Sequence, residues 1–374
     1  MRRSTHGTSA ADSHWYAAVR LLGMSPRRAF LLAARIAGNA YLGSGPYKAV
    51  VCATYRCDCH CSFCGIWRRQ AEELPAAVLV EALARLPGIA WVDVTGGELF
   101  LRPDYEELCV GLARRLPSLA LFHFPTAGQR PEEALKLART MSGRGIRTVV
   151  TVSIDGPPAL HDRLRGVPGA WDRAMETFLA LRAERGIDVF LGTTLVPENV
   201  DSYPQSIVEA IKARCPDISP HEFHVNVMQR SGHYFSNQEQ ELPTAAQLGA
   251  ALTRAMRWRG LPHSPFALLE WAYQMVARRA TKERATPLCQ ALRTSFFLAP
   301  NGLVQPCHIW DSPVGRIDAA NPNLAPWLTS AAAHEARTMI AGRRCPVCWT
   351  PCEAYPTLLA AAANPCRTLN RKPS

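Results

Sequence analysis

The sequence lacks the features that mark membrane-spanning and secreted proteins. No stretch reaches the ~18–20 consecutive apolar residues that a helix needs to cross a bilayer. The basic N-terminus holds a short apolar run, Phe30–Ala34, but Arg35 interrupts it and no clear cleavage site follows, which argues against a secretory signal. Low-complexity runs are few and 48% of the residues are hydrophobic, so we expect a sizeable packed core. The 13 cysteines, clustered near both ends of a long chain, suggest metal binding in a reducing cytoplasm.

The chain also lacks the recognition motifs with interleaved aromatic residues that are typical of nucleic-acid binding. Its formal net charge of +11 still favours anionic partners. Those partners include a phosphorylated or acidic substrate, an acidic redox donor such as flavodoxin, and a membrane surface. A solvated basic surface is the simplest interpretation, and we predict no nucleic-acid partner.

The length of 374 residues suits two domains or one barrel with an extension. From residue 47 onward, strand and helix patterns alternate, which indicates a parallel sheet. We expect strands at 47–54, 90–95, 119–125, 147–153, 188–196 and 222–227, and helices at 76–85, 105–116, 131–142, 171–185 and 203–214. Such units form a partial (β/α)6 version of the eight-stranded TIM-type barrel, whose chemistry lies at the C-terminal ends of the strands.

We divide the chain into an amphipathic helical extension (1–46), a barrel (47–235), a helical connector (236–286) and a small cysteine-rich domain (287–374). In the extension, Pro26 separates two helical patterns, and Ser25 is the expected cap of the second. A basic amphipathic helix can lie on an anionic membrane, although it more often packs against its own protein. Both interpretations stay open.

The stretch 54–67 holds the most informative motif. Cys57, Cys61 and Cys64 fit C-x3-C-x2-C, and no other triple of the 13 cysteines does. Four thiolates normally hold an iron–sulfur cube. Three thiolates from one loop leave one iron without a protein ligand, and such an open position is typical of a reactive metal site. Phe63 would shield the cluster from water.

Two other uses of these cysteines compete with the cluster. A zinc knuckle uses CxxC pairs with a fourth ligand nearby, but His60 lies between cysteines and is poorly placed to complete a tetrahedron. A disulfide framework is disfavoured because the chain is long and shows no secretion signal.

Cys57, Cys61 and Cys64, together with the aromatic Phe63, resemble the cluster motif of the radical S-adenosylmethionine superfamily. The resemblance implies a [4Fe-4S] cluster whose open iron binds the amino and carboxylate groups of S-adenosylmethionine. A one-electron donor such as flavodoxin or ferredoxin would reduce the cluster. The sulfonium bond then breaks, and the 5′-deoxyadenosyl radical abstracts a hydrogen from the substrate.

Gly96, Gly97 and Glu98 follow the second expected strand. The glycines allow a close backbone approach, and the carboxylate can bind an ammonium group, although an ordinary turn would explain this tripeptide equally well. Here it resembles the family motif that contacts the amino group of S-adenosylmethionine. Leu99 stands where the family usually has proline.

Two further strand ends resemble family motifs. Thr126 begins a turn similar to Thr-Asn-Gly, with Ala127 in place of asparagine, so that a side-chain contact from this position is lost. In members that modify peptides and natural products, a serine after the fourth strand hydrogen-bonds the cofactor and a later arginine pairs with the cofactor carboxylate. The resemblance assigns these roles to Ser153 and Arg165, with Arg173 as a competing candidate.

Two polar stretches have weaker signals. Asp155 and Gly156 read as an ordinary loop turn. His224, His233 and Tyr234 lie in and after the sixth strand and offer groups that would face a substrate at the barrel mouth, although a lone histidine more often has a structural role.

A second group of cysteines lies near the C-terminus. Cys289 and Cys307 bracket an expected hairpin at 301–302, and Cys345 and Cys348 form a CxxC pair. Such thiolates ligate zinc or iron–sulfur clusters, and a zinc ribbon stays open. The region resembles the SPASM and Twitch auxiliary domains, which implies at least one auxiliary [4Fe-4S] cluster on these four cysteines.

The full SPASM pattern has seven cysteines, whereas this region has six with shortened spacing. One auxiliary cluster is therefore favoured. Cys352 and Cys366 would replace one of the four ligands or serve a second cluster.

The reaction implied by the resemblance is hydrogen abstraction followed by net oxidation, with redox-neutral epimerisation as an alternative. A ribosomal peptide or other natural-product precursor is the first choice of substrate, although no separate leader-binding domain is recognised before the barrel. A lipid or sugar is the second choice. A non-enzymatic iron–sulfur carrier or zinc adaptor is the third, and no catalytic acid or base is assigned.

Overall fold

The computed structural model describes residues 25–283, 286–346 and 348–365. In this part of the chain, nine strands form one sheet in the order β6-β5-β4-β3-β2-β1-β7-β8-β9. The strands are β1 (Lys48–Thr54), β2 (Trp91–Gly96), β3 (Leu121–Thr126), β4 (Arg147–Ser153), β5 (Ile187–Leu195), β6 (Phe223–Val227), β7 (Ser295–Leu298), β8 (Leu303–Gln305) and β9 (Gly315–Arg316).

The first group of helices lies before β6 in the chain: the first of them precedes β1, and the others lie between the parallel strands. These are α2 (Pro26–Leu42), α3 (Ala76–Ala84), α4 (Tyr105–Arg115), α5 (Pro131–Ser142), α6 (Pro158–Arg165), α7 (Ala170–Arg182) and α8 (Gln205–Lys212). The second group follows β6 and comprises α9 (Ala245–Arg259), α10 (Pro265–Glu283), α11 (Ala325–Leu328), α12 (Ala331–Ala341) and α13 (Pro351–Ala363). Short 3-10 helices lie at Ile66–Arg68 (η1), Leu99–Leu101 (η2) and Pro220–Glu222 (η3).

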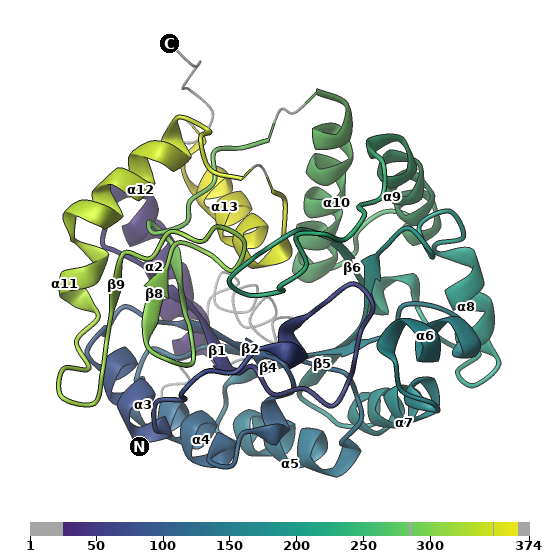
Figure 1. Ribbon diagram of the computed structural model, residues 1–374, viewed down its shortest axis with the longest axis horizontal. Helices are drawn as coiled ribbons and strands as arrows, with labels where there is room; N and C mark the ends of the chain where they lie inside the picture. The colour runs from purple at the N-terminus through teal and green to yellow at the C-terminus, as the bar shows by residue number, and fades with distance from the viewer. Residues whose placement is uncertain (1–24, 284–285, 347, 366–374) are drawn as a thin grey trace, which may run out of the picture.

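The expected partial barrel is confirmed. Strands β1 to β6 are parallel, and helices α3, α4, α5, α7 and α8 cover their outer face, while α10 and α13 lie across the open side of the barrel (Figure 1). Every expected strand and connecting helix is present, with small shifts of its ends. Helix α6 was not expected.

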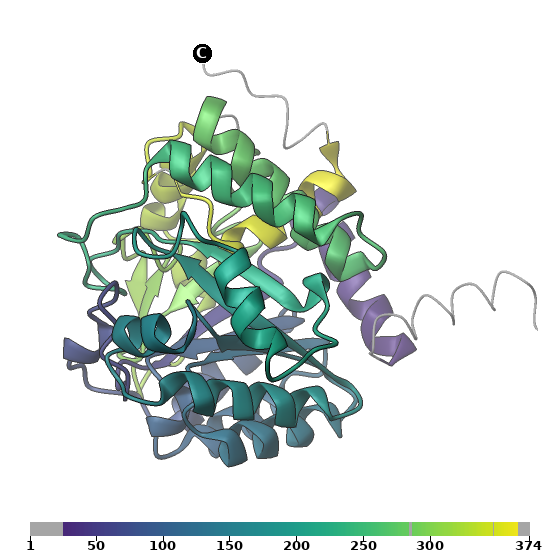
Figure 2. The same cartoon turned by 90° about the vertical axis from the view of Figure 1, so that its right-hand side faces the viewer.

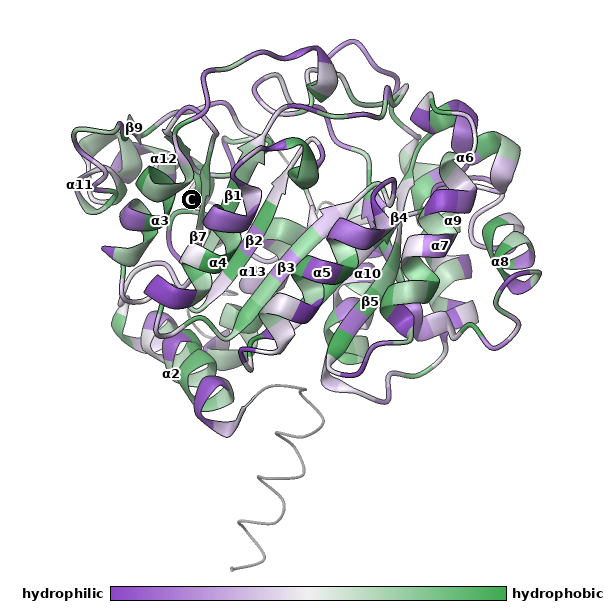
Figure 3. Ribbon diagram, turned by 90° about the horizontal axis from the view of Figure 1, so that it is seen from below, coloured by the Kyte–Doolittle hydropathy of each residue, from purple (hydrophilic) through white to green (hydrophobic). Residues whose placement is uncertain are grey.

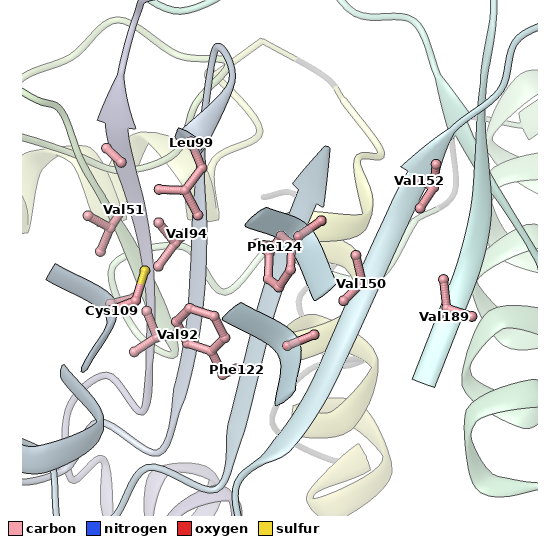
Figure 4. Close-up of a cluster of buried hydrophobic side chains, with 14 of the residues drawn as sticks. Val51, Val92, Val94, Leu99, Cys109, Phe122, Phe124, Val150, Val152 and Val189 are labelled. Atoms are coloured by element: carbon pink, nitrogen blue, oxygen red, sulfur yellow. The ribbon is translucent and has the colours of Figure 1, made fainter. Parts of the chain in front are cut away.

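Alternate residues of the strands separate an apolar outer face from a more polar inner face. Outward residues such as Val92, Phe122 and Val150 form a fully buried layer under the helices (Figure 4). Burial of each such side chain contributes about 1.5–3 kcal/mol. The helices turn their polar residues away from the sheet (Figure 3). On the inner face, the half-exposed residues include Thr95, His123, Ser153, Thr194, His224 and Asn226, together with Pro125 and Phe190.

A buried charge network fills the lower part of the barrel. Lys48 Nζ lies 2.8 Å from Asp93 Oδ2, and both side chains are buried. The other oxygen, Asp93 Oδ1, accepts from Trp91 Nε1 at 2.6 Å and lies 3.3 Å from His123 Nδ1. Lys48 Nζ also donates to the Cys352 carbonyl at 2.7 Å. The network therefore joins three strands to the start of α13.

Helix α2 begins as the sequence predicts. The Ser25 hydroxyl accepts from the Arg28 N–H, and Pro26 occupies the first turn. The helix lies along the flank of the barrel (Figure 2), where Ala29 and Ala40 are buried against the body. Contact of this region with a membrane stays a prediction, and within the described residues no helix meets the length and hydropathy needed to span one.

The predicted hairpin around Gly302 is present as β7 and β8, which pair antiparallel. Strand β7 also pairs in parallel with β1, so the cysteine-rich region continues the barrel sheet. Gly302 has φ +83°, and a Cβ there would lie 2.1 Å from the Ile317 carbonyl oxygen. Only glycine fits that turn.

Replacing Asp93 with Ala is expected to lower the free energy of unfolding by about 3–5 kcal/mol, because Lys48 would keep a buried charge without its partner. Urea denaturation measures this loss. Burial alone would raise the pKa of Asp93, but Lys48 and a hydrogen bond from His123 outweigh it and hold the pKa below the usual 3.8. The wild-type advantage is thus present above about pH 4 and shrinks at lower pH. Glu81→Ala, which removes an exposed partner of Arg85, is the control, and an equal loss there would contradict the assignment.

Candidate cluster and cofactor site

The cysteine loop lies between β1 and η1, at the C-terminal ends of the barrel strands. Its backbone is held by two neighbouring segments. The N–H of His60 donates to the Arg165 carbonyl at 2.8 Å, and the N–H of Ser62 donates to the Leu164 carbonyl at 2.9 Å, both from α6. From the other side, the N–H of Gly65 donates to the Phe235 carbonyl at 2.6 Å. The loop is therefore anchored before any ligand binds.

The thiols of this loop differ in protonation. Burial raises the pKa of Cys61 to about 11 and that of Cys64 to about 12, although the charge of Arg165 opposes the rise. A hydrogen bond with Cys59 lowers the pKa of Cys57, whereas the same bond and burial raise that of Cys59. Each thiol that binds a metal must release its proton when the metal binds.

The donor set fits an iron–sulfur cube. Within the described residues, no three metal-binding side chains are gathered closely enough to hold a single ion. A cube distributes its thiolates over separate irons, and the thiols of Cys57, Cys61 and Cys64 lie near enough to influence one another's charge. Phe63 packs against Leu164 and Met228 beside this loop.

The two glycines after β2 allow the second strand to approach the cysteine loop. Gly96 has φ +145°, and a Cβ there would lie 2.2 Å from the Thr54 carbonyl oxygen. A Cβ on Gly97 would lie 2.0 Å from the Arg56 carbonyl oxygen. Instead, the N–H of Gly97 donates to Thr54 at 2.8 Å. No side chain fits in either position, so the turn and the loop form one unit.

Glu98 is fully buried beside this contact. Its Oε2 accepts from Thr126 Oγ1 at 3.0 Å and from the Ala127 N–H at 2.9 Å. Its Oε1 has no hydrogen-bond partner among the described residues. Burial raises the pKa of Glu98 to about 8. A buried carboxyl with one free oxygen is suited to receive a cation. The hydrogen bond from Ala127 to Glu98 uses the backbone N–H, so it does not need the asparagine side chain that Ala127 replaces.

Asp155 corrects the expectation of an ordinary loop turn. It is fully buried, and its Oδ2 accepts from Arg165 Nε at 2.7 Å. Its Oδ1 accepts from the Thr194 N–H, and its carbonyl accepts from Asn199 Nδ2, both at 2.9 Å. Because α6 returns Arg165 to the end of β4, the ion pair joins that strand end to the helix that holds the cysteine loop. His161, one turn earlier on α6, accepts from the Asp155 N–H at 3.0 Å, so the four-residue spacing of His161 and Arg165 was the available sequence signal.

Arg165 places its positive charge beside the cysteine loop. Its Nη1 lies 3.8 Å from Cys61 Sγ, and its guanidinium lies 5.6 Å from the Phe63 ring centroid. Because Asp155 already neutralises Arg165, its pairing with a cofactor carboxylate stays a prediction. The competing Arg173 is half-exposed on α7 and donates to Gln129 Oε1 at 2.6 Å.

The second cysteine group also comes together in space. Burial raises the pKa of Cys348 well above its usual value, and negative charge on Cys307, Cys289 and Cys345 adds to the effect. These are the four predicted auxiliary ligands. Cys352, at the start of α13, is near Cys307. Cys366 lies outside the described residues.

The segment after β6 differs from the expectation of free groups at the barrel mouth. His233 and Tyr234 are buried and hydrogen-bonded to other parts of the chain. His224 contacts Glu270 at 3.0 Å. His224 nevertheless lies on the inner face with the other half-exposed residues described above, and these are the groups that face the barrel interior. Their period-two spacing along the strands was the signal that could have identified them.

Together, the partial barrel and the three-cysteine loop at its strand ends define a class of cluster-binding α/β barrels. Residues 51–211 match the family described as the Radical SAM superfamily. The match covers the barrel from β1 into α8, so this part of the chain is similar to that superfamily.

Individual relatives are more distant. The sporulation killing factor maturation protein SkfB of Bacillus subtilis is 23% identical over 73% of this chain and 62% of its own length. An AdoMet-dependent heme synthase of Oleidesulfovibrio alaskensis is 23% identical over 76% of this chain and 75% of its own.

Two solved structures share the fold. Streptococcus suis SuiB bound to S-adenosylmethionine covers 81% of this chain and 71% of its own, with a TM-score of 0.56 and 15% identity. Native anSMEcpe with bound AdoMet covers 85% and 97%, with a TM-score of 0.55 and 13% identity.

Glu98→Gln is expected to stabilise the cluster-free protein at pH 8.5 by about 1–3 kcal/mol. The folded pKa near 8 exceeds the usual 4.5, so the stability of the wild type falls as the pH rises through this interval. Glutamine cannot ionise and keeps an oxygen acceptor. Denaturation at pH 8.5 and pH 5 tests this, because the advantage should shrink at pH 5. Glu106→Gln, on exposed α4, is the control. A pH-independent effect of Glu98→Gln would refute the assignment.

Proposed function

We propose that this chain reductively cleaves S-adenosylmethionine to a 5′-deoxyadenosyl radical, abstracts a substrate hydrogen and oxidatively modifies a peptide or other natural-product precursor. The observation that carries the proposal is the packing of the cysteine loop against the turn that holds Glu98. It sets three thiols beside a buried carboxyl with a free oxygen. Those groups match the two requirements of the cofactor, a cluster and an acceptor for an ammonium group.

The residues of this site would bind either the cluster or the cofactor. Cys57, Cys61 and Cys64 would hold the [4Fe-4S] cluster, which when bound supplies the electron that breaks the sulfonium bond. Glu98 would accept the ammonium of S-adenosylmethionine through its free Oε1. Arg165 places a positive charge beside Cys61, which favours the thiolate form.

Five other assigned residues would complete the cofactor site. Gly96 and Gly97 would hold the turn against the cysteine loop where the cofactor binds, and Thr126 orients Glu98 through their hydrogen bond. Ser153 ends β4 on the inner face and would hydrogen-bond the cofactor. The phenyl ring of Phe63 would limit the access of water to the cluster.

The substrate would enter the barrel from the strand ends, where the inner face is polar and partly exposed. His123 is the candidate proton acceptor, because it is half-exposed and its Nδ1 lies 3.3 Å from Asp93. Asp93 would stabilise the imidazolium that forms after proton uptake. The side-chain hydroxyls and amides around it suit the hydrogen-bonding groups of a peptide backbone.

Three names among the similar proteins support a peptide substrate. SkfB is a maturation protein of a sporulation killing factor, SuiB has been solved with the precursor peptide SuiA, and anSMEcpe with the Kp18Cys peptide. The heme synthase relatives favour a small-molecule substrate as the second candidate.

The auxiliary site would hold at least one further [4Fe-4S] cluster on Cys289, Cys307, Cys345 and Cys348. When bound, this cluster would supply a one-electron acceptor for the oxidation. The basic net charge of +11 suits an acidic electron donor such as flavodoxin or ferredoxin.

Anaerobic reconstitution with iron and sulfide, followed by dithionite and S-adenosylmethionine, is expected to yield 5′-deoxyadenosine. Cys64→Ala should lower this yield by at least about 100-fold, because the cube would lose one of three protein ligands. Cys59→Ala is the matched control on the same loop and should retain the iron. Iron analysis and chromatography of the nucleoside measure both outcomes. Well-loaded wild-type protein that forms no 5′-deoxyadenosine would refute the proposal.

Cys348→Ala is expected to remove about half of the bound iron and to spare 5′-deoxyadenosine formation at saturating S-adenosylmethionine, because the two proposed ligand sets share no cysteine. Iron content and the electron paramagnetic resonance spectrum of the reduced protein measure the change. Loss of 5′-deoxyadenosine formation together with the bound iron would show that the two cysteine groups do not form separate clusters.

A further inference from the structure

One segment contacts both cysteine groups and the turn that holds Glu98. We define the residues Ser231–Asn237, which follow β6, as the bridging segment. It crosses the region between the cysteine loop and the β7–β8 hairpin. Its side chains and backbone make hydrogen bonds in three directions.

Toward the cysteine loop, Asn237 Nδ2 donates to the Phe63 carbonyl at 3.0 Å. The Phe235 carbonyl accepts from the Gly65 N–H at 2.6 Å. These bonds flank Cys64 on either side in the sequence. The bridging segment therefore fixes the backbone around the last cysteine of the motif.

Toward the auxiliary cysteines, Ser231 Oγ donates to the His308 carbonyl at 2.7 Å. His233 Nε2 lies 3.1 Å from the Cys307 carbonyl oxygen, so the tautomer that carries the proton on Nε2 donates to it. The bridging segment therefore holds the backbone of a predicted auxiliary ligand.

Toward the turn, Tyr234 donates its hydroxyl proton to the Gly96 carbonyl at 3.1 Å. Its oxygen lies 2.9 Å from Thr95 Oγ1. Because the phenol has one proton, Thr95 donates in the second bond. The Tyr234 ring is buried and meets the rings of Phe297 and His308 edge to face, with centroids 5.5 and 5.7 Å away. Together, these contacts of the ring and the hydroxyl fix the position of the Tyr234 hydroxyl.

The φ angle of Gly96 must be fixed by contacts with other parts of the chain. Glycine adopts positive and negative φ with similar ease, so the sequence of the turn does not by itself fix the φ of +145°. The Gly97 N–H bond to the Thr54 carbonyl at 2.8 Å and the Tyr234 bond to the Gly96 carbonyl hold the two ends of one peptide, and together they select its orientation before Glu98. The direction of the Glu98 side chain follows from that orientation.

We propose that Tyr234 is a positioning residue that sets the Gly96–Glu98 turn for S-adenosylmethionine, and that the bridging segment makes this setting depend on the Cys307 site. The proposal rests on the proposed role of Glu98 in binding S-adenosylmethionine. It deepens that function by coupling cofactor binding at the first cysteine group to the state of the second.

Tyr234→Phe removes only the hydroxyl. In the full-length, cluster-free protein, amide hydrogen exchange at Gly97 and Glu98 is expected to accelerate about tenfold, equivalent to 1.4 kcal/mol. In the anaerobically reconstituted protein, S-adenosylmethionine is expected to bind about tenfold more weakly at unchanged iron content. Tyr105→Phe is the matched control, because the Tyr105 hydroxyl contacts exposed Glu106 on α4. Wild-type exchange and affinity in Tyr234→Phe would overturn the positioning role.

A double-mutant cycle tests the coupling. Cys307→Ala is expected to weaken S-adenosylmethionine binding a few-fold in the wild-type background and to have no further effect in the Tyr234→Phe background. Equal losses in both backgrounds, or no loss in either, would overturn the coupling.

Two further outcomes are separable. If Tyr234→Phe does not fold, Thr95→Val removes the partner hydroxyl without changing the bridging segment, and it should accelerate exchange at Gly97. If the reconstituted wild type does not bind S-adenosylmethionine, the proposed function fails. Exchange in the cluster-free protein still decides whether Tyr234 sets the turn.

Discussion

The backbone contact between the end of β1 and the turn after β2 is the constraint on which the site depends. Gly96 and Gly97 approach the Thr54 and Arg56 carbonyls so closely that a Cβ at either position would overlap them. The cysteine loop and the turn consequently share one rigid backbone unit. Glu98 is buried as a result, and burial is what raises its pKa and leaves one oxygen free for a cation.

Charges elsewhere in the barrel are arranged around this unit. Arg165 brings a guanidinium to the cysteine loop, and Asp155 neutralises it in the low-dielectric interior, where an unpaired charge would be costly. At the lower end, the pair of Lys48 and Asp93 closes the barrel and holds α13 through the Cys352 carbonyl. The inner face between these pairs is polar and partly exposed, which suits a substrate that reacts near the strand ends.

Local patterns predicted most of the fold. The expected strand at 147–153 coincides with β4, and the hairpin at Gly302 is present, because periodicity and turn residues act over short distances. Helix α6 was missed because Asp155 and Gly156 resemble a turn and prolines follow. The role of Asp155 was missed because its partners Thr194 and Asn199 are distant in sequence.

By itself, the sequence determined the alternation of strands and helices, the spacing of the three cysteines and the glycines that permit a close backbone approach. The tertiary structure alone decided that Arg165 reaches Cys61, that β7 extends the barrel sheet beside β1, and that Tyr234 contacts the turn at Gly96. Local pattern records which conformations a segment can adopt. Burial, pKa and hydrogen-bond partners arise only when segments far apart in the chain pack together, because desolvation and charge act through space.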